Sequence, residues 1–338
     1  MKKTFYLGID VSKQTLDYCL LHNGQVIESG KLPNLTGPIK SLINQVRKNY
    51  CTDLSELGIC IEHTGIYNNH LLDVVQKLGL LIYVENANQI KKSLGVTRGK
   101  NDTVDAERIA RYIWKHEDTS RPWVAPRNVL IKLKSLLVLR SRLICALKQL
   151  KTPLKEMAGY TEKSMMKYLT QNCKSAIKGV EDDLKKVNRE IESTIELDDR
   201  LSEVFRYVTS VEGIGPITAA EIIVSTNEFK NINKPKKFAC YSGVAPFEHS
   251  SGTSIRGKSK VSHQANKTIK SLLHMGAMCV IRMKNSELRA YYIRKVAEGK
   301  NKMSVLNAIR NKLIQRIYAC VQNKKIYEKN YNFNLVKP

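Results

Sequence analysis

Four carboxylates in the first third of the chain have the types and spacing to hold a divalent cation. Asp102 and Asp105 lie three residues apart in the stretch GKNDTVDAERIARY, while Asp10 and Glu62 belong to apolar runs further upstream. At about 100° per residue, Asp102 falls inside the apolar stripe of the helix expected there, and Asp105 lies at its edge. A helix cap would explain Asp102 but explains Asp105 poorly. Because acids turned toward a core are costly unless a cation neutralises them, we expect a bound metal.

The types of donor atom indicate which metal ion would bind and which reaction it would support. All four ligands would be hard oxygens, and no Cys or His stands nearby in a zinc-like spacing, so Mg²⁺ or Mn²⁺ is expected. The eight cysteines are scattered singly and are interpreted as small core residues in a reducing compartment. Two metal ions side by side stabilise both the attacking and the leaving oxygen of a phosphodiester in transfer. The expected chemistry is therefore the cutting or joining of nucleic-acid strands.

The elements that must position these acids indicate an α/β domain over residues 1–125. The stretch TFYLGIDVS alternates in hydropathy, and the runs LDYCLLH and QVIESGKL flank Asn23-Gly24, a strong hairpin signal. A helix from Ile39 to Val46, the strand LGICIEH, a helix from Leu71 to Leu78 and the strand LLIYVE follow. Three antiparallel strands followed by helices alternating with strands are typical of the ribonuclease-H-like fold.

In this fold order, Asp10 and Glu62 lie on neighbouring strands and project from the same face of the sheet. Each acid has a small residue two positions earlier on its own face, Gly8 and Cys60, which leaves room for another group to approach. The sequence therefore predicts that the two acids on strands and the two aspartates of the later helix meet in one site.

A different pattern begins after Pro126. Leucines recur at three or four residues from Leu130 to Leu154, and apolar residues do the same after a break near Gly159. This pattern predicts a long helical hairpin, a coiled-coil arm over residues 126–205. Two interpretations stay open, because the arm could pair two chains or could pack on its own domain.

Residues 206–325 are interpreted as a mainly helical domain, and residues 326–338 as a basic tail. The run VEGIGPITAAEII matches a helix-hairpin-helix turn, in which Gly213 and Gly215 permit a tight turn. Amides at the start of the following helix can hold a phosphate without reading sequence. The alternative is a plain Gly-Pro break between two helices.

A basic loop, HSSGTSIRGKSK, follows this turn. From Gly252 to Lys302 there are 12 Lys or Arg against 2 Glu, a local charge of +10. Arg256, Lys258 and Lys260 are candidates to clamp a phosphate. A serine beside such a clamp is a candidate nucleophile that forms a covalent phosphoester with a DNA end. A flexible loop that only binds nucleic acid is the alternative.

The charge of the whole chain agrees with a nucleic-acid partner. Its formal net charge of +25 over 338 residues favours a polyanion. No apolar run approaches the roughly 20 residues that span a bilayer. The apolar run at the start stops at Asp10, unlike that of a signal peptide. We therefore expect binding of DNA or RNA, no membrane association and a cytoplasmic location.

Several motifs, in order and spacing, resemble those of the DEDD transposases of the insertion-sequence-110 type, to which pilin-gene DNA invertases are related. The motifs are YLGIDVSK, CIEHTGIY, KNDTVDAERIARY, GIGPITAAEI, CYSGVAPFEHSSGTSIRG and SVLNAIRNKLIQRIYA. The resemblance covers nearly the whole chain and implies a RuvC-like N-terminal domain. It places the metal-binding acidic tetrad on Asp10, Glu62, Asp102 and Asp105.

The same resemblance implies a C-terminal transposase domain with a nucleophilic serine just before a glycine, which favours Ser251, with Ser250 next and Ser254 third. It also implies a structured guide RNA, the bridge RNA, that pairs with donor and target DNA. A homo-oligomer, dimer or tetramer, would combine the acids of one chain with the serine of another. The sequence leaves open a DNA invertase acting on fixed sites, a RuvC-like junction-resolving nuclease that uses water, and a nucleic-acid-packaging protein with structural acids.

Overall fold

The computed structural model describes residues 3–51, 53–93, 102–251, 255–261 and 265–329, with no side chains described for 102–103 and 247–260. The chain divides into two compact units, Met1–Ala125 and Pro126–Pro338. None of the helices in the described ranges is both long enough and apolar enough to cross a membrane.

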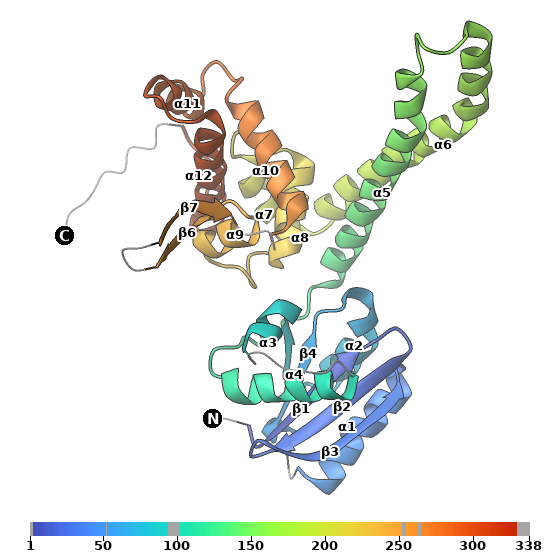
Figure 1. Cartoon of the computed structure of the whole chain (residues 1–338), viewed down its shortest axis with the longest axis vertical. Helices are drawn as coiled ribbons and strands as arrows, with labels where there is room; N and C mark the ends of the chain where they lie inside the picture. The colour runs from blue at the N-terminus through green and yellow to red at the C-terminus, as the bar shows by residue number, and fades with distance from the viewer. Residues whose placement is uncertain (1–2, 52, 94–101, 252–254, 262–264, 330–338) are drawn as a thin grey trace, which may run out of the picture. The chain divides into compact units, whose positions relative to one another are not determined.

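The first unit is built on a five-stranded mixed sheet with the strand order β3-β2-β1-β4-β5 (Figure 1). An antiparallel meander consists of β1 (Phe5–Val11), β2 (Thr15–His22) and β3 (Gln25–Pro33). Two strands parallel to β1 complete the sheet, β4 (Leu57–Glu62) and β5 (Ile82–Glu85). The helices of this unit are α1 (Thr36–Asn49), α2 (Asn69–Lys77), α3 (Ala87–Ser93) and α4 (Asp102–His116). The RuvC-like, ribonuclease-H-like order predicted from the sequence is confirmed.

The turn between β2 and β3 is the Asn23-Gly24 pair that the sequence predicts. Asn23 has a φ of 51° and Gly24 a φ of 79°, as a two-residue hairpin turn of the primed type requires. The twist of such a turn matches that of the two strands it joins. In the resulting register, Asp17 of β2 pairs with Lys31 of β3.

Alternation of side chains gives the sheet two apolar faces. One face, which includes Leu7 and Ile59, packs against α1 and α2. The other face includes Tyr6 and Cys60 and packs against α4, which Figure 1 shows lying across the sheet. The helix contributes the apolar stripe expected from its sequence, consisting of Ala106, Ile109, Ala110 and Ile113.

The second unit begins with the predicted helical hairpin, formed by α5 (Asn128–Glu156) and α6 (Lys163–Glu196). Six residues at its base are buried in the same hydrophobic cluster as the C-terminal helices: Leu130, Leu133, Leu137, Val187, Ile191 and Ile195. The base of the arm therefore packs on its own chain, as one of the two interpretations of the sequence requires. Its tip exposes Tyr160, Met165 and Tyr168.

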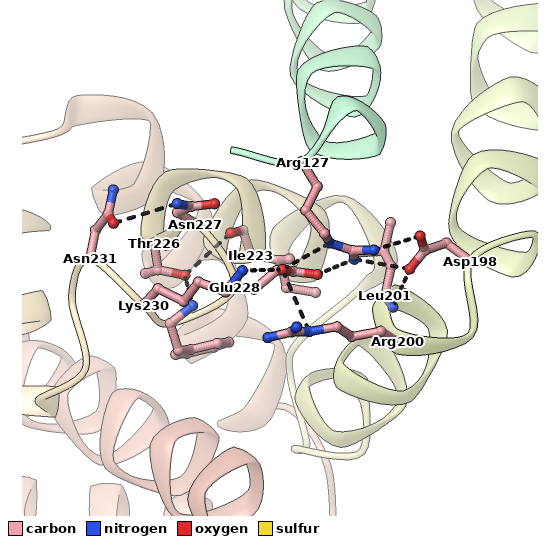
Figure 2. A network of polar contacts seen from close by, with 11 residues as sticks. Arg127, Asp198, Arg200, Leu201, Ile223, Thr226, Asn227, Glu228, Lys230 and Asn231 are labelled. Atoms are coloured by element: carbon pink, nitrogen blue, oxygen red, sulfur yellow. Dashed lines mark hydrogen bonds and ion pairs between the residues drawn. The ribbon is translucent and has the colours of Figure 1, made fainter. Parts of the chain in front are cut away.

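Arg127, the residue before α5, anchors both ends of this hairpin (Figure 2). Its guanidinium donates to the two carboxylate oxygens of Asp198 at 2.7 and 2.9 Å, and Asp198 caps the helix that follows α6. It also donates to both carboxylate oxygens of Glu228, whose side chain is fully buried. Arg200 and Lys230 pair with the same carboxylate at 3.7 and 3.3 Å. The anchor therefore neutralises one buried acid with three cations.

The remaining helices form the mainly helical C-terminal domain that the sequence predicts. They are α7 (Asp199–Thr209), α8 (Pro216–Thr226), α9 (Pro235–Tyr241), α10 (Lys267–Val280), α11 (Glu287–Ala297) and α12 (Lys302–Asn323). A two-stranded hairpin of β6 (Pro246–Ser251) and β7 (Ile255–Val261) stands between α9 and α10. A single hydrophobic cluster joins these helices to the base of the arm.

The cysteines are free, but the interpretation that all of them are core residues is wrong. Cys145, Cys240 and Cys279 are exposed, because they lie on the outer faces of α5, α9 and α10. The buried cysteines are Cys19, Cys51, Cys60 and Cys320.

Candidate active site

Asp10 and Glu62 lie at the ends of adjacent parallel strands. In the register of β1 and β4, Gly8 pairs with Cys60 and Ile9 with Ile61, so the next position on each strand is the acid. Residues at matching positions of neighbouring strands project from the same face, with the strands about 5 Å apart. The two acids therefore stand side by side on the face that α4 covers.

Gly8 brings α4 into backbone contact with the sheet at this point. A Cβ built on Gly8 would lie 2.3 Å from the backbone nitrogen of Ala110 and 2.4 Å from the carbonyl oxygen of Ala106. Only a hydrogen fits in that space, so the helix approaches as closely as a helix can. Because Gly8 and Asp10 share a face, the start of α4 lies beside the acidic strand ends.

Asp105 precedes Ala106 on this helix and is partly buried. Its carboxylate forms an ion pair of 2.7 Å with Arg108, one turn further along α4. Asp102 is the first residue of α4, and its side chain lies outside the described residues. A metal ion at Asp105 would therefore have to compete with Arg108 for this carboxylate.

Two carboxylates that the sequence patterns missed continue the row of acids across the sheet. Asp17 of β2 pairs with Asp10, and Glu85 of β5 pairs with Glu62. Asp17 is neutralised by Lys31 at 3.2 Å. Burial raises the pKa of the Glu85 carboxyl above its ordinary value. Strand register was the only signal that could have identified Glu85.

Two buried asparagines hold the loops that follow the acidic strand ends. Asn34 donates through Nδ2 to the carbonyl oxygen of Ser12 at 2.9 Å and to that of Tyr67 at 3.0 Å. These loops follow the acids of β1 and β4, so Asn34 links the two strand ends. Asn68, which is 1% exposed, donates to the main-chain carbonyl oxygen of Glu62 at 3.1 Å.

The residues fit a divalent cation in their chemistry and in the elements that carry them. Oxygen donors alone suit Mg²⁺ or Mn²⁺, and the acids come from two adjacent strand ends and from the helix packed over them. Within the described part of the chain, no three His, Cys, Asp or Glu side chains lie close enough together to hold one ion. A complete site therefore needs Asp105 to leave Arg108 and Asp102 to join it.

The turn between α7 and α8 has the backbone of the predicted helix-hairpin-helix. Gly213 has a φ of 84°, and Gly215 precedes α8, which begins at Pro216. A Cβ on Gly213 would lie 2.7 Å from the carbonyl oxygen of Gly276 on α10, whereas Gly215 is exposed with open space around it. Gly213 is thus placed for helix packing, whereas the predicted contact of Gly215 with a nucleic acid stays a prediction.

The hairpin of β6 and β7 carries the candidate nucleophiles. Ser251 is the last residue of β6, where the strand enters the loop, and Ser250 pairs with Arg256 in the antiparallel register. Ser254 lies outside the described residues. The three basic candidates are all on β7, namely Arg256, Lys258 and Lys260.

Two family models match the chain, one at each of these sites. A DEDD transposase model of the insertion-sequence-110 type matches residues 7–158, which contain the acidic strands and α4. The model described as "Transposase IS116/IS110/IS902 family" matches residues 206–293, which contain the serine hairpin. The chain belongs to this family of transposases. It is accordingly an enzyme that binds and processes DNA, and DEDD enzymes typically depend on a divalent metal.

The transposase is similar over almost its full length to two pilin gene-inverting proteins. That of Moraxella bovis is 26% identical over 339 residues, covering 97% of this chain and 99% of the relative. That of Moraxella lacunata is 27% identical with the same coverage. Among solved structures, Thermus thermophilus RuvC in complex with a Holliday junction substrate is 12% identical, with a TM-score of 0.28, and the match covers 36% of this chain and 99% of that one.

Proposed function

We propose that this transposase cleaves and rejoins DNA strands to move its own insertion element. Asp10, Glu62, Asp102 and Asp105 would hold Mg²⁺ or Mn²⁺, which polarises the scissile phosphate when bound. The observation that carries the proposal is the register of β1 and β4, which sets Asp10 beside Glu62 directly under the start of α4.

The chain's own residues keep these acids in place. The two strand ends are paired within the sheet, and Asn34 and Asn68 hold the loops that leave them. Such supports keep carboxylates oriented, so that little reorganisation is needed during the reaction. Arg108 pairs with Asp105 in this structure, and a bound metal would replace it as the partner of that carboxylate.

Ser251 is the proposed nucleophile, with Ser250 as the alternative. A bond forms between the serine Oγ and phosphorus while the bond from phosphorus to the departing DNA oxygen breaks. The serine proton leaves with that oxygen, so the number of phosphodiester bonds is conserved. A DNA hydroxyl then attacks the phosphorus of the serine phosphodiester, the bond between phosphorus and the serine Oγ breaks, and the hydroxyl proton passes to the serine, which rejoins the strand. Cations on β7 offset the charge on the phosphoryl oxygens, and the candidates are Arg256, Lys258 and Lys260.

Two further parts of the proposal concern partners. A structured bridge RNA pairs with donor and target DNA and supplies the choice of sequence, so the protein contacts mainly backbone and shape. The net charge of +25 supports such diffuse binding. The arm joins chains into a dimer or tetramer, and its exposed tip supports this role, with Tyr160 93% and Tyr168 65% exposed.

End-labelled DNA on a denaturing gel tests the covalent step. The parent protein should form a protein–DNA adduct, Ser251→Ala should abolish both adduct and cleavage, and Ser250→Ala is the matched control that retains both. If Ser251→Ala cut DNA normally and the parent never formed an adduct, water would be the nucleophile, as in a junction-resolving nuclease.

Site-specific DNA inversion is the second candidate function. It is favoured by the near full-length similarity to two pilin gene-inverting proteins. A plasmid assay separates the two functions, because an invertase flips a segment between fixed inverted sites without an added RNA. A guided transposase requires a structured RNA that matches both the element junction and the target.

A further inference from the structure

Arg310 of α12 is buried within the C-terminal helices. The residue is 6% exposed, and its Nε has no hydrogen-bond partner among the described residues. No carboxylate in the described ranges forms an ion pair with it, and burial lowers the pKa of its guanidinium below the ordinary value. A buried charge of this kind is costly unless an anion accompanies it.

The start of α10 and the Asn307 side chain of α12 both contact the backbone segment 243–244, which precedes β6. Asn307, one turn before Arg310, donates through Nδ2 to the carbonyl oxygen of Val244 at 2.7 Å. A Cβ on the adjacent Gly243 would lie 3.7 Å from Nζ of Lys270 on α10. Lys270 and Asn307 therefore approach the segment 243–244 from two different helices.

The same two helices also approach each other further along. A Cβ on Gly276 of α10 would lie 3.5 Å from Cδ1 of Leu313 on α12. Along the chain, Arg310 lies between Asn307 and Leu313, and His274 lies between Lys270 and Gly276, so both basic residues belong to the stretches over which α10 and α12 pack. The electrostatic influence of Arg310 on the pKa of His274 indicates that the two side chains lie near each other.

On these contacts between α10 and α12, we group the side chains of Lys270, His274 and Arg310 as one basic cluster. In the described part of the chain, the buried Nδ1 atom of His274 has no hydrogen-bond partner, like Nε of Arg310. Burial and the charge of Arg310 lower the pKa of His274 below its ordinary value. Lys270 and His274 are both partly exposed, which opens the cluster to solvent.

We propose that Arg310, His274 and Lys270 form a phosphate-binding site that takes one phosphodiester group of a nucleic acid. A guanidinium is the side chain best suited to phosphate, and a bound phosphate would supply the counter-ion that Arg310 lacks. The site lies at the base of the serine hairpin, because Val244 is two residues before β6. This inference rests on the proposed function, because the strand bound here would be the strand that the serine hairpin cleaves.

Binding experiments on the full chain carrying Asp10→Asn test the site without strand cleavage. Affinity for a short DNA duplex and for an RNA hairpin of the same charge is measured over a range of salt concentrations. Arg310→Gln should weaken binding to at least one of them by about tenfold and reduce the salt slope by about one. Lys312→Gln, which removes an exposed charge two residues further along α12, is the control and should weaken binding by less than about twofold.

The nucleic acid whose affinity falls identifies the source of the phosphate. Inorganic phosphate should also raise the melting temperature of the parent but not that of Arg310→Gln. Should Arg310→Gln fail to fold by circular dichroism, Lys270→Gln takes its place with the same expected losses. Unchanged affinity for both DNA and RNA in correctly folded variants would overturn the proposal. Because the readout is binding and not strand cleavage, failure of the metal and serine mechanism would leave this result unaffected.

Discussion

The amide nitrogen of Ala110 on α4 lies directly over the Cα of Gly8 on β1, so close that a Cβ on Gly8 would come within 2.3 Å of it. This contact sets the height of α4 above the sheet. It thereby decides how far the aspartates of α4 stand from the acids at the strand ends.

Gly8→Ala should destabilise the first unit and reduce strand cleavage. The added methyl group meets backbone atoms, which cannot rotate away, so α4 must shift at a cost of about 1–3 kcal/mol. Urea unfolding measures the cost, and Gly37→Ala on α1 is the matched control. Its Cβ would meet nothing within 4 Å, so that variant should be as stable as the parent or slightly more so. A Gly8→Ala protein with the stability and activity of the parent would show that the contact is not required.

Asp10→Asn should lower strand cleavage by at least about 100-fold, because one of the oxygens that hold the metal loses its charge. Asp17→Asn, on the paired position of β2, should change cleavage only a few-fold. That acid already forms an ion pair with Lys31. Single-turnover cleavage at several Mg²⁺ concentrations measures both variants. Equal losses in the two variants would mean that the whole row of acids acts as one unit.

Asn68→Ala should raise the Mg²⁺ concentration needed for half-maximal cleavage by about tenfold, because the main chain at Glu62 loses its support. The adjacent Asn69 is exposed and begins α2, so Asn69→Ala is the control with the same change of side chain. Cleavage by Asn68→Ala should recover at high Mg²⁺. A loss that no Mg²⁺ concentration restores would point to misfolding of the strand end instead.

Arg127→Ala should destabilise the second unit by about 3 kcal/mol, because it leaves the carboxylates of Asp198 and Glu228 partly unpaired. Thermal unfolding measures the effect. Arg200→Ala is the control, since Arg200 is more exposed and makes only a longer ion pair of 3.7 Å to Glu228. Similar losses in both variants would contradict the central place of Arg127 in the anchor.

The same anchor predicts a loss of stability in acid. Hydrogen bonds from Arg127 lower the pKa of Asp198 below its ordinary value of 3.8. Burial alone would raise the pKa of Glu228, but hydrogen bonds and charge from Arg127, together with Lys230, lower it below 4.5. Both pKa values are lower in the folded state, so the stabilisation is present above the ordinary values and is lost as the pH falls through the lowered ones. Denaturant midpoints at a series of pH values should show this loss in the parent and a weaker one in Arg127→Ala.

Local patterns predicted the N-terminal domain well. Strand alternation and the Asn23-Gly24 turn act over a few residues, and they were enough to give the order of the five strands. The helical hairpin followed from apolar spacing in the same way, but the same spacing could not show whether its base packs on its own chain. The tertiary structure shows that it does, because Leu130 and Ile195 are buried in one cluster with helices that are far away in the sequence.

The sequence by itself determined which residues are the candidates for the chemistry, namely carboxylates on two strands and one helix, and a serine beside basic residues. Tertiary structure alone decided that Asp17 and Glu85 continue the acidic row, that Arg127 anchors the arm, and that Arg310 is buried with no acidic partner among the described side chains. The physical reason is that strand register and helix packing join residues far apart in the chain. No periodicity within one segment encodes which partner a side chain will meet in another.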